Sequence, residues 1–466
     1  MSIPPAPQGL EAVSDLQPPP SALQRRQFGT AGLRLTLRGR TIRLRGLRRP
    51  PTGALRWLAI LGPGIVAGAA GNDGGAIASY SSAGAQFGYD LLWLIVILTV
   101  SLAVVQEMSA RLGAATGRGL LDLIRERFGL SWALFAISIV LLANGGLIVS
   151  EFVGIGSGME LMGVSKYISV PLAAALVWFL VVVGSYNRVE KIFLIMTLVF
   201  FAYPVAAVLA HPHWNEVAKG VLMPKFHLSA GYITVFVGLI GTTLTPYQQL
   251  FQQSAVVEKG LARRHYGPER IDVYAGQVFS NLVAIFIIIA TAATLHAHGK
   301  TAINTAADAA QALQPIAGNA AKTIFAVGLV GASLLSAAVL PLATAYSISE
   351  AFGFAKGVSL DFRRGRVFFG LFTFLLLFGA GVALIPNVPV ITLLVGVQVF
   401  NGILLPVFLL FIMLLINDRR LTGNLKNTRL YNILGWGTFA LVTIAVVVLL
   451  GAQALGLFGL QLFGGS

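Results

Sequence analysis

An apolar segment starts like a membrane helix but breaks off after 14 residues, and this break constrains the chain more than any other feature. The segment from Trp57 to Ala70 is followed by Gly71-Asn72-Asp73-Gly74-Gly75. Its helix would cover about 21 Å, short of the ~30 Å hydrocarbon core of a bilayer. Asp73 is therefore expected at membrane depth, where a carboxylate without a partner costs at least ~2.5 kcal/mol. Irregular backbone there is tolerated where it lines a protein cavity, so we interpret the break as half of an ion site.

The composition places this break in a membrane protein. Of the 466 residues, 56% are hydrophobic and 11% are charged, whereas soluble domains carry about 25% charged residues. Cytoplasmic loops collect lysine and arginine, and this explains the net charge of +15 better than a nucleic-acid partner does. The chain has no cysteine and therefore neither disulfides nor thiolate metal sites. We recognise no cleavable signal peptide and no enzyme motif.

The hydrophobic segments predict one transmembrane domain over residues 57–466 with about eleven helices. After the broken first helix, the predicted helices cover residues 91–112, 132–159, 168–184, 192–209, 232–257, 273–295, 324–351, 367–384, 390–416 and 431–455. The sixth is also interrupted, at Thr242-Thr243-Leu244-Thr245-Pro246-Tyr247. Two interrupted helices that each head a set of five are typical of an inverted-repeat transporter, whose site lies at the midplane between the breaks.

Basic residues predict the orientation in an inner cell membrane. With the N-terminus in the cytoplasm, 28 of the 33 lysines and arginines fall on the cytoplasmic side, as the positive-inside rule requires, and the C-terminus lies outside. Residues 1–56 are predicted to be a basic, largely disordered cytoplasmic tail with ten arginines between Arg25 and Arg56. We expect it to rest on anionic lipids. The stretch from Arg34 to Arg45 has the alternation of a short strand or ribbon.

Asp73 is the first candidate for a cation ligand. The glycines around it allow an unwound turn that exposes backbone carbonyls, and a carboxylate with carbonyls forms a hard-oxygen cation site. In the structural alternative, Asp73 caps the following half-helix and accepts from the N–H of Ala76 or Ile77. The two roles are compatible. Asn72 is open between cap and ligand.

The second break supplies further candidates. Pro246 removes a backbone donor and is expected to free a carbonyl near Thr242, and Thr245 adds a hydroxyl. Four amides follow on the second half-helix: Gln248, Gln249, Gln252 and Gln253. Amides in a membrane helix are costly without partners. They therefore either line a hydrated vestibule or hydrogen-bond to neighbouring helices.

Other polar residues leave two interpretations open. Glu151 either belongs to a site or proton path, or pairs with an arginine such as Arg363 or Arg364. Gln398 either faces the cavity or packs between helices. The same choice applies to Asn281 and Asn401. Three histidines, His211, His213 and His227, fall in a predicted outside loop and are interpreted as exposed residues rather than a metal site.

Several sequence blocks resemble the NRAMP (natural resistance-associated macrophage protein) divalent-metal transporters. They are G-P-G-I-V-A-G-A-A, A-G-A-Q-F-G-Y-D-L-L-W and Q-E-M-S-A-R-L-G-A-A-T-G-R-G-L near the first two helices, G-L-I-G-T-T-L-T-P-Y in the sixth, and I-N-D-R-R-L after the tenth. The resemblance covers roughly residues 55–455. It implies an all-α polytopic membrane protein with a LeuT-like inverted repeat: two sets of five helices, the first and sixth unwound, plus an eleventh helix.

The chain departs from the family at both breaks. The family's D-P-G-N aligns with D-G-G-A, so the resemblance implies that the aspartate ligand is kept as Asp73 and the asparagine ligand is replaced by Ala76. The family's Met-Pro-His aligns with T-P-Y, which puts Thr245 in place of the methionine ligand. A thioether selects softer metals, so its loss favours hard ions that prefer oxygen.

The residues that the family uses for protons are also changed. Tyr247 and Gln252 align with the two histidines of the sixth helix, and Ile148 aligns with an aspartate of the third, which leaves Glu151. This pattern resembles the NRAMP-related magnesium transporters. Because Mg²⁺ keeps several waters and needs only one or two carboxylates, small residues at the site suit it.

We therefore expect a secondary transporter of divalent cations, Mg²⁺ and also Mn²⁺, uncoupled from protons and without a cofactor. The expected metal or substrate ligands are Asp73, Thr242, Thr245, Asn72, Ala76 and Gln398, supported by Glu151, Tyr247, Gln248 and Gln252. The alternatives are a proton-coupled Mn²⁺ or Fe²⁺ transporter like ordinary NRAMPs, an NRAMP-like transporter of a small organic solute, and a membrane receptor that transports nothing.

Overall fold

A computed structural model describes residues 33–37, 40–44, 63–183, 202–227, 229–260, 266–303, 305–310, 321–358 and 360–457. The chain forms two compact units, Met1–Ala59 and Ile60–Ser466. The first unit contains an antiparallel hairpin of β1 (Leu33–Leu37) and β2 (Arg40–Leu44), with Leu35 opposite Ile42. The short ribbon predicted within the tail is therefore confirmed, whereas a domain boundary after residue 56 stays a prediction.

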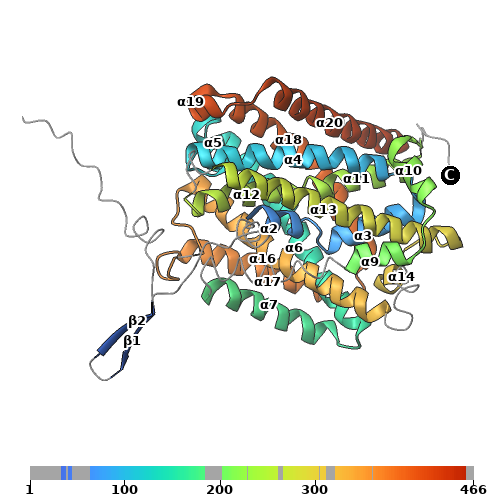
Figure 1. The fold of residues 1–466 in the computed structure, drawn as a ribbon, viewed down its shortest axis with the longest axis horizontal. Coiled ribbons are helices and arrows are strands. Elements are labelled where there is room, and N and C mark those ends of the chain that lie inside the picture. The colour runs from blue at the N-terminus through green and yellow to red at the C-terminus, as the bar shows by residue number, and fades with distance from the viewer. Residues whose placement is uncertain are drawn as a thin grey trace, which may run out of the picture. The chain divides into compact units, whose positions relative to one another are not determined.

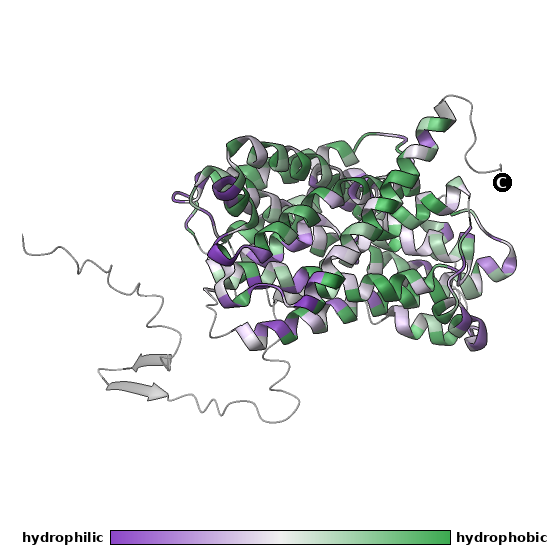
Figure 2. Cartoon of the chain, turned by 90° about the horizontal axis from the view of Figure 1, so that it is seen from above, coloured by the Kyte–Doolittle hydropathy of each residue, from purple (hydrophilic) through white to green (hydrophobic). Residues whose placement is uncertain are grey.

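The second unit is built from long apolar helices (Figure 1). Among the described residues, eight helices are long and apolar enough to cross a membrane. They are α4 (Leu92–Thr116), α6 (Leu130–Leu161), α7 (Lys166–Val183), α13 (Tyr266–Thr294), α16 (Ala321–Phe352), α17 (Arg366–Ala383), α18 (Val390–Asn417) and α20 (Arg429–Leu457). Hydrophilic residues gather toward the two ends of these helices (Figure 2). The predicted spans agree with them to within a few residues at most ends.

Both predicted interruptions are present. The first helix is divided into α2 (Pro63–Ala70) and α3 (Gly74–Phe87), and the sixth into α11 (Ala230–Thr243) and α12 (Pro246–Glu258). Asp73 is extended, with φ −67° and ψ 178°, and caps α3. Pro246 begins α12, a position where its fixed φ suits the helix and its missing N–H is not needed.

The half-helices belong to different layers. The first half of the first helix, α2, and the second half of the sixth helix, α12, pack with α4 and α13, and we call these four helices the α4–α13 bundle. A second body contains α6, α7, α16 and α17. The other two halves, α3 and α11, pack against α18, and α3 also packs against α13 of the bundle. Both breaks therefore lie where these layers meet.

Short helices distinguish the two ends of the unit. The α5 end carries α5 (Leu120–Phe128) and α19 (Arg419–Thr422), and the α10 end carries α10 (Trp214–Leu222) and α14 (Ala306–Ala310) (Figure 1). These polar, short elements were not predicted. Of the predicted fifth helix, residues 192–209, only α9 (Ala202–Leu209) is described, and the remainder lies outside the described residues.

Candidate functional site

Asp73 lies between α2 and α3 with 1% of its surface exposed. Its Oδ1 accepts from the main-chain N–H of Ala76 at 2.6 Å and from Nε2 of Gln398 on α18 at 3.0 Å. Its Oδ2 has no hydrogen-bond partner. One oxygen thus caps α3, as the structural interpretation requires, while the other is a buried acceptor without a donor.

Gln398 reaches Asp73 because Gly75 has no side chain. A Cβ on Gly75 would lie 2.4 Å from Nε2 of Gln398 and 3.3 Å from Oδ1 of Asp73. The amide oxygen of Gln398 is buried and has no partner. The structure thus places Gln398 beside the break rather than in a contact between apolar helices, and its free oxygen adds a second candidate ligand.

Polar groups from other helices satisfy the backbone of the first break. The carbonyl of Ala70, the last residue of α2, accepts from the hydroxyl of Tyr247 at 2.6 Å and from Oγ of Ser336 on α16 at 2.9 Å. Asn72 donates from Nδ2 to the carbonyl of Ser280 on α13 at 3.0 Å, and its Oδ1 has no partner. Tyr247 therefore satisfies a backbone carbonyl at the break.

The second break differs from its prediction. The hydroxyl of Thr245 donates to the carbonyl of Thr242 at 2.9 Å. The expectation of a free carbonyl at Thr242 is thus wrong, because a hydroxyl three residues further along the chain takes the place of the donor that proline removes. The hydroxyl of Thr242 itself is buried without a partner. Ala76 contributes its N–H to Asp73, and its side chain is fully buried.

Glu151 on α6 also contacts the first break. Its Oε2 accepts from the main-chain N–H of Gly74, the first residue of α3, at 3.1 Å, and its Oε1 accepts from the hydroxyl of Ser150 at 3.2 Å. The alternative of an ion pair with Arg363 or Arg364 is wrong, because the carboxylate is fully buried and turned toward α3. A carboxylate is well placed there, since the N-terminus of a helix favours negative charge.

Of the four glutamines, Gln248 borders the first break. Gln248 accepts from Nε2 of Gln106 on α4 at 3.3 Å, and its own Nε2 would lie 1.9 Å from a Cβ on Gly71. Gln252 donates to Glu269 on α13 at 3.2 Å and therefore bonds to a neighbouring helix. Gln253 likewise donates to the carbonyl of Arg118, at 2.8 Å. The hydrated-vestibule interpretation thus fits Gln248 better than the other amides.

The remaining candidates form no hydrogen bond with Asp73. Asn401 donates to the carbonyl of Val397 in its own helix at 3.1 Å. Asn281 on α13 is buried and neither atom of its amide has a partner. The loop histidines are exposed, as predicted. Sequence analysis missed Ser280 and Ser336. Ser336 could have been found, because the apolar sequence of α16 contains two serines three positions apart, Ser333 and Ser336.

A cavity of about 570 Å³ opens at the α10 end, beside the last turn of α3. Asp90 lines it, with 2.9 Å from Oδ1 to Nζ of Lys225 and 2.8 Å from Oδ2 to Nε2 of His227. Burial raises the pKa of Asp90, but the hydrogen bonds and charges of these two partners outweigh it and hold the pKa below its usual value. Asp90 is therefore a tether between segments and not a vacant cation ligand.

Within the described ranges, no group of three or more His, Cys, Asp or Glu side chains is arranged to hold a metal ion. The carboxylates that contact the first break are those of Asp73 and Glu151. The sequence model of the family described as natural resistance-associated macrophage protein-like matches residues 64–452. The chain belongs to the Nramp family.

Nramp proteins are transporters, and the relatives of this chain agree with that assignment. It is 28% identical over 395 residues to a divalent metal cation transporter, MntH, of Klebsiella pneumoniae (strain 342), covering 83% of this chain and 92% of the relative. It is 30% identical over 297 residues to MntH of Yersinia pestis (strain Pestoides F), covering 61% and 71%.

Solved structures show the same fold. The manganese transporter of Eremococcus coleocola, in complex with an aromatic bis-isothiourea substituted compound, matches with a TM-score of 0.69 at 19% identity and covers 88% of this chain and 90% of its own. MhsT in complex with L-phenylalanine matches with a TM-score of 0.53 at 16% identity, covering 86% and 99%. The predicted LeuT-like fold with two unwound helices is thereby confirmed.

Proposed function

We propose that this Nramp chain carries divalent metal cations across the membrane, Mg²⁺ and also Mn²⁺, through the break between α2 and α3. The observation that carries the proposal is a set of buried oxygens without donors: Asp73 Oδ2, Gln398 Oε1, Thr242 Oγ1 and Asn72 Oδ1. Leaving such groups unsatisfied costs about 1–3 kcal/mol each. A cation or its water ligands would satisfy them.

The chemistry of this set supports a hard cation. All four atoms are oxygens, and oxygen ligands suit Mg²⁺ and Mn²⁺. Ala76 and Thr245 offer no thioether or amide. Since Mg²⁺ dehydrates reluctantly, a site with one carboxylate and small neighbours favours an ion that keeps part of its hydration shell. The similarity to a manganese transporter and to divalent metal cation transporters supports the class of substrate.

We further propose that transport is uncoupled from protons. Ile148 supplies no acid on α6, and the hydroxyl of Tyr247 is engaged with Ala70. The ion would then follow its electrochemical gradient, to which an inside-negative potential contributes ~2.3 kcal/mol per charge per 100 mV. Proton coupling is the second candidate, because Glu151 is a buried carboxylate that contacts the same half-helix as Asp73.

The distribution of basic residues supports an orientation with the α5 end in the cytoplasm. Arg118, Arg125 and Arg127 lie around α5, and Arg419 and Arg420 lie in α19 at the same end. The positive-inside rule assigns such an end to the cytoplasm. We propose that the N-terminus lies on this side and that its arginines contact anionic lipids.

Uptake into proteoliposomes that contain a magnesium indicator and a pH indicator tests the proposed function. We expect entry of Mg²⁺ and Mn²⁺ without acidification of the lumen. Acidification during Mn²⁺ uptake would overturn the uncoupled mechanism and favour the second candidate. The double variant Ala76→Asn with Thr245→Met should shift the preference toward Mn²⁺ or Cd²⁺, and an unchanged ratio would contradict the argument from ligand softness.

A further inference from the structure

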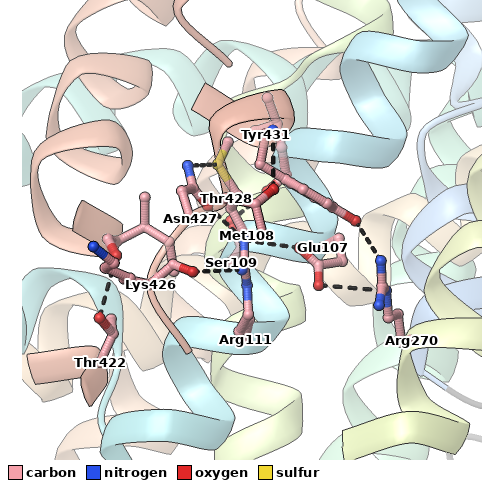
Figure 3. A network of polar contacts seen from close by, with 12 residues as sticks. Glu107, Met108, Ser109, Arg111, Arg270, Thr422, Lys426, Asn427, Thr428 and Tyr431 are labelled. Carbon is pink, nitrogen blue, oxygen red and sulfur yellow. Dashed lines mark hydrogen bonds and ion pairs between the residues drawn. The ribbon is translucent and has the colours of Figure 1, made fainter. Parts of the chain in front are cut away.

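Glu107 is a buried carboxylate of α4 in a polar network that also contains residues of α13 and α20 (Figure 3). Its side chain is 2% exposed and lies 3.1 Å from Nη2 of Arg111 and 3.7 Å from Nε of Arg270 on α13. The hydroxyl of Tyr266, also on α13, donates to it at 2.8 Å. Glu107 therefore joins two helices of the α4–α13 bundle and orients two arginines.

The two arginines that pair with Glu107 also contact α20 and the segment that precedes it. Arg111 donates to the amide oxygen of Asn427, and its guanidinium lies 4.9 Å from the centre of the Tyr431 ring. Arg270 donates to the hydroxyl of Tyr431 at 2.8 Å (Figure 3). Tyr431 is thus contacted from α4 and from α13 at once, whereas Asn427 is contacted from α4.

The contacts that cross to α20 differ from those inside the bundle. Inside the bundle, Glu107 forms ion pairs, whereas the crossing contacts are hydrogen bonds from the arginines to neutral groups and cation–π contacts. Arg270 is 47% exposed, so its charge becomes hydrated once Tyr431 withdraws. The crossing contacts are therefore the ones that can break without leaving a buried charge unpaired.

The bundle also contains α2, the half-helix before the first break, which contacts both α13 and α16. A Cβ on Gly68 of α2 would lie 2.4 Å from the carbonyl oxygen of Gly276 on α13, so the two backbones are in direct contact. The hydroxyl of Ser336 donates a hydrogen bond to the carbonyl of Ala70, and both residues are fully buried. An opening between α2 and α16 at the α5 end would therefore carry α13 with it and strain its contacts with α20.

We propose that Glu107, Arg111, Arg270, Asn427 and Tyr431 form a latch that holds the α4–α13 bundle against α20 while the α5 end is closed, and that this latch releases when the site opens at that end. The inference rests on the proposed transport function, because it assigns the network a role in the change of access. Glu107 is a positioning residue for the two arginines, and Asn427 and Tyr431 are the partners that separate.

The chain offers a direct test because it has no cysteine. Ser336→Cys introduces a single buried thiol between α2 and α16, and its alkylation rate by N-ethylmaleimide, without added metal, reports opening. In this background we expect Asn427→Ala combined with Tyr431→Phe to raise the rate at least about tenfold, as loss of two contacts to charged groups predicts. Glu107→Gln should act in the same direction.

The matched control is Thr373→Val, which removes two hydrogen bonds inside the second body: one accepted from Trp178 at 2.9 Å and one donated to the carbonyl of Phe369 at 2.7 Å. It should leave the alkylation rate unchanged. An unchanged rate in Asn427→Ala/Tyr431→Phe, with a wild-type elution profile in size-exclusion chromatography, would overturn the latch. If the alkylation rate rises in the variant but wild-type proteoliposomes take up no divalent cation, the proposed function fails and the latch does not. If the wild type takes up divalent cations normally but the alkylation rate in the variant is unchanged, the latch fails and the proposed function does not.

Discussion

The substitution Gly75→Ala should impair the site without unfolding the protein. Its new methyl group would lie 2.4 Å from Nε2 of Gln398, about 1 Å closer than ordinary van der Waals contact allows. The nearest atom belongs to the end of a flexible side chain, so Gln398 can withdraw. Because Gly75 is in the first turn of α3, alanine should raise helix stability by roughly 0.5–1 kcal/mol.

The cost appears in ion binding. Withdrawal of Gln398 lengthens its 3.0 Å hydrogen bond to Asp73 beyond bonding distance and moves its free oxygen from the site. A hydrogen bond to a charged group contributes about 1.5–3 kcal/mol. We therefore expect the concentration of Mg²⁺ or Mn²⁺ at half-maximal uptake to rise about 10- to 150-fold.

A double-mutant cycle with Gln398→Ala separates this mechanism from a general disturbance of α3. Uptake is measured for the wild type, Gly75→Ala, Gln398→Ala and the double variant, with Gly370→Ala as control, because a Cβ at Gly370 meets no atom within 4 Å. In the Gln398→Ala background, Gly75→Ala should have little further effect. Fully additive losses would refute the argument that the glycine acts by admitting Gln398.

Three further expectations concern single contacts. Tyr247→Phe removes one of two donors to the carbonyl of Ala70 and should lower the free energy of unfolding by about 1 kcal/mol in thermal denaturation; no change would mean that Ser336 suffices. Glu151→Gln keeps an acceptor for Gly74 but removes the charge, so Mg²⁺ uptake in the flux assay should stay within a few-fold of wild type across pH 6–8. If uptake by the variant depended less on pH than uptake by the wild type, that result would instead support proton coupling. The folded-state pKa of Asp90 is below its unfolded value of about 3.9, so its stabilisation is complete above that pH and is lost as the pH falls through the folded pKa. The melting temperature of Asp90→Asn should therefore lie below wild type at pH 5–7 and converge with it below about pH 4, whereas a constant difference would contradict the tether.

The breaks were predictable because their causes are local. Glycines and an aspartate interrupt one apolar run, and Pro246 interrupts another. The bond from Thr245 to Thr242 was overlooked although it spans only three residues. It is the kind of local side-chain contact by which threonine satisfies a backbone carbonyl.

The partners of Asp73 were not predictable with the same certainty because they depend on how helices are rotated. Gln398 lies 325 positions from Asp73 along the chain, and only the packing of α18 against α3 brings them together. The direction of Glu151 depends likewise on the rotation of α6, which the apolar sequence on all sides of that helix leaves undetermined. The network around Glu107 joins three helices and was missed for the same reason.

Calorimetric titration of the purified protein with Mg²⁺ and with Mn²⁺, compared between wild type and Asp73→Asn, tests the central claim most directly. Asparagine keeps the size of the side chain and its ability to cap α3, so the substitution removes mainly the charge. We predict saturable binding of both ions by the wild type and none by Asp73→Asn. Equal binding by the variant would contradict the assignment of the first break as the cation site.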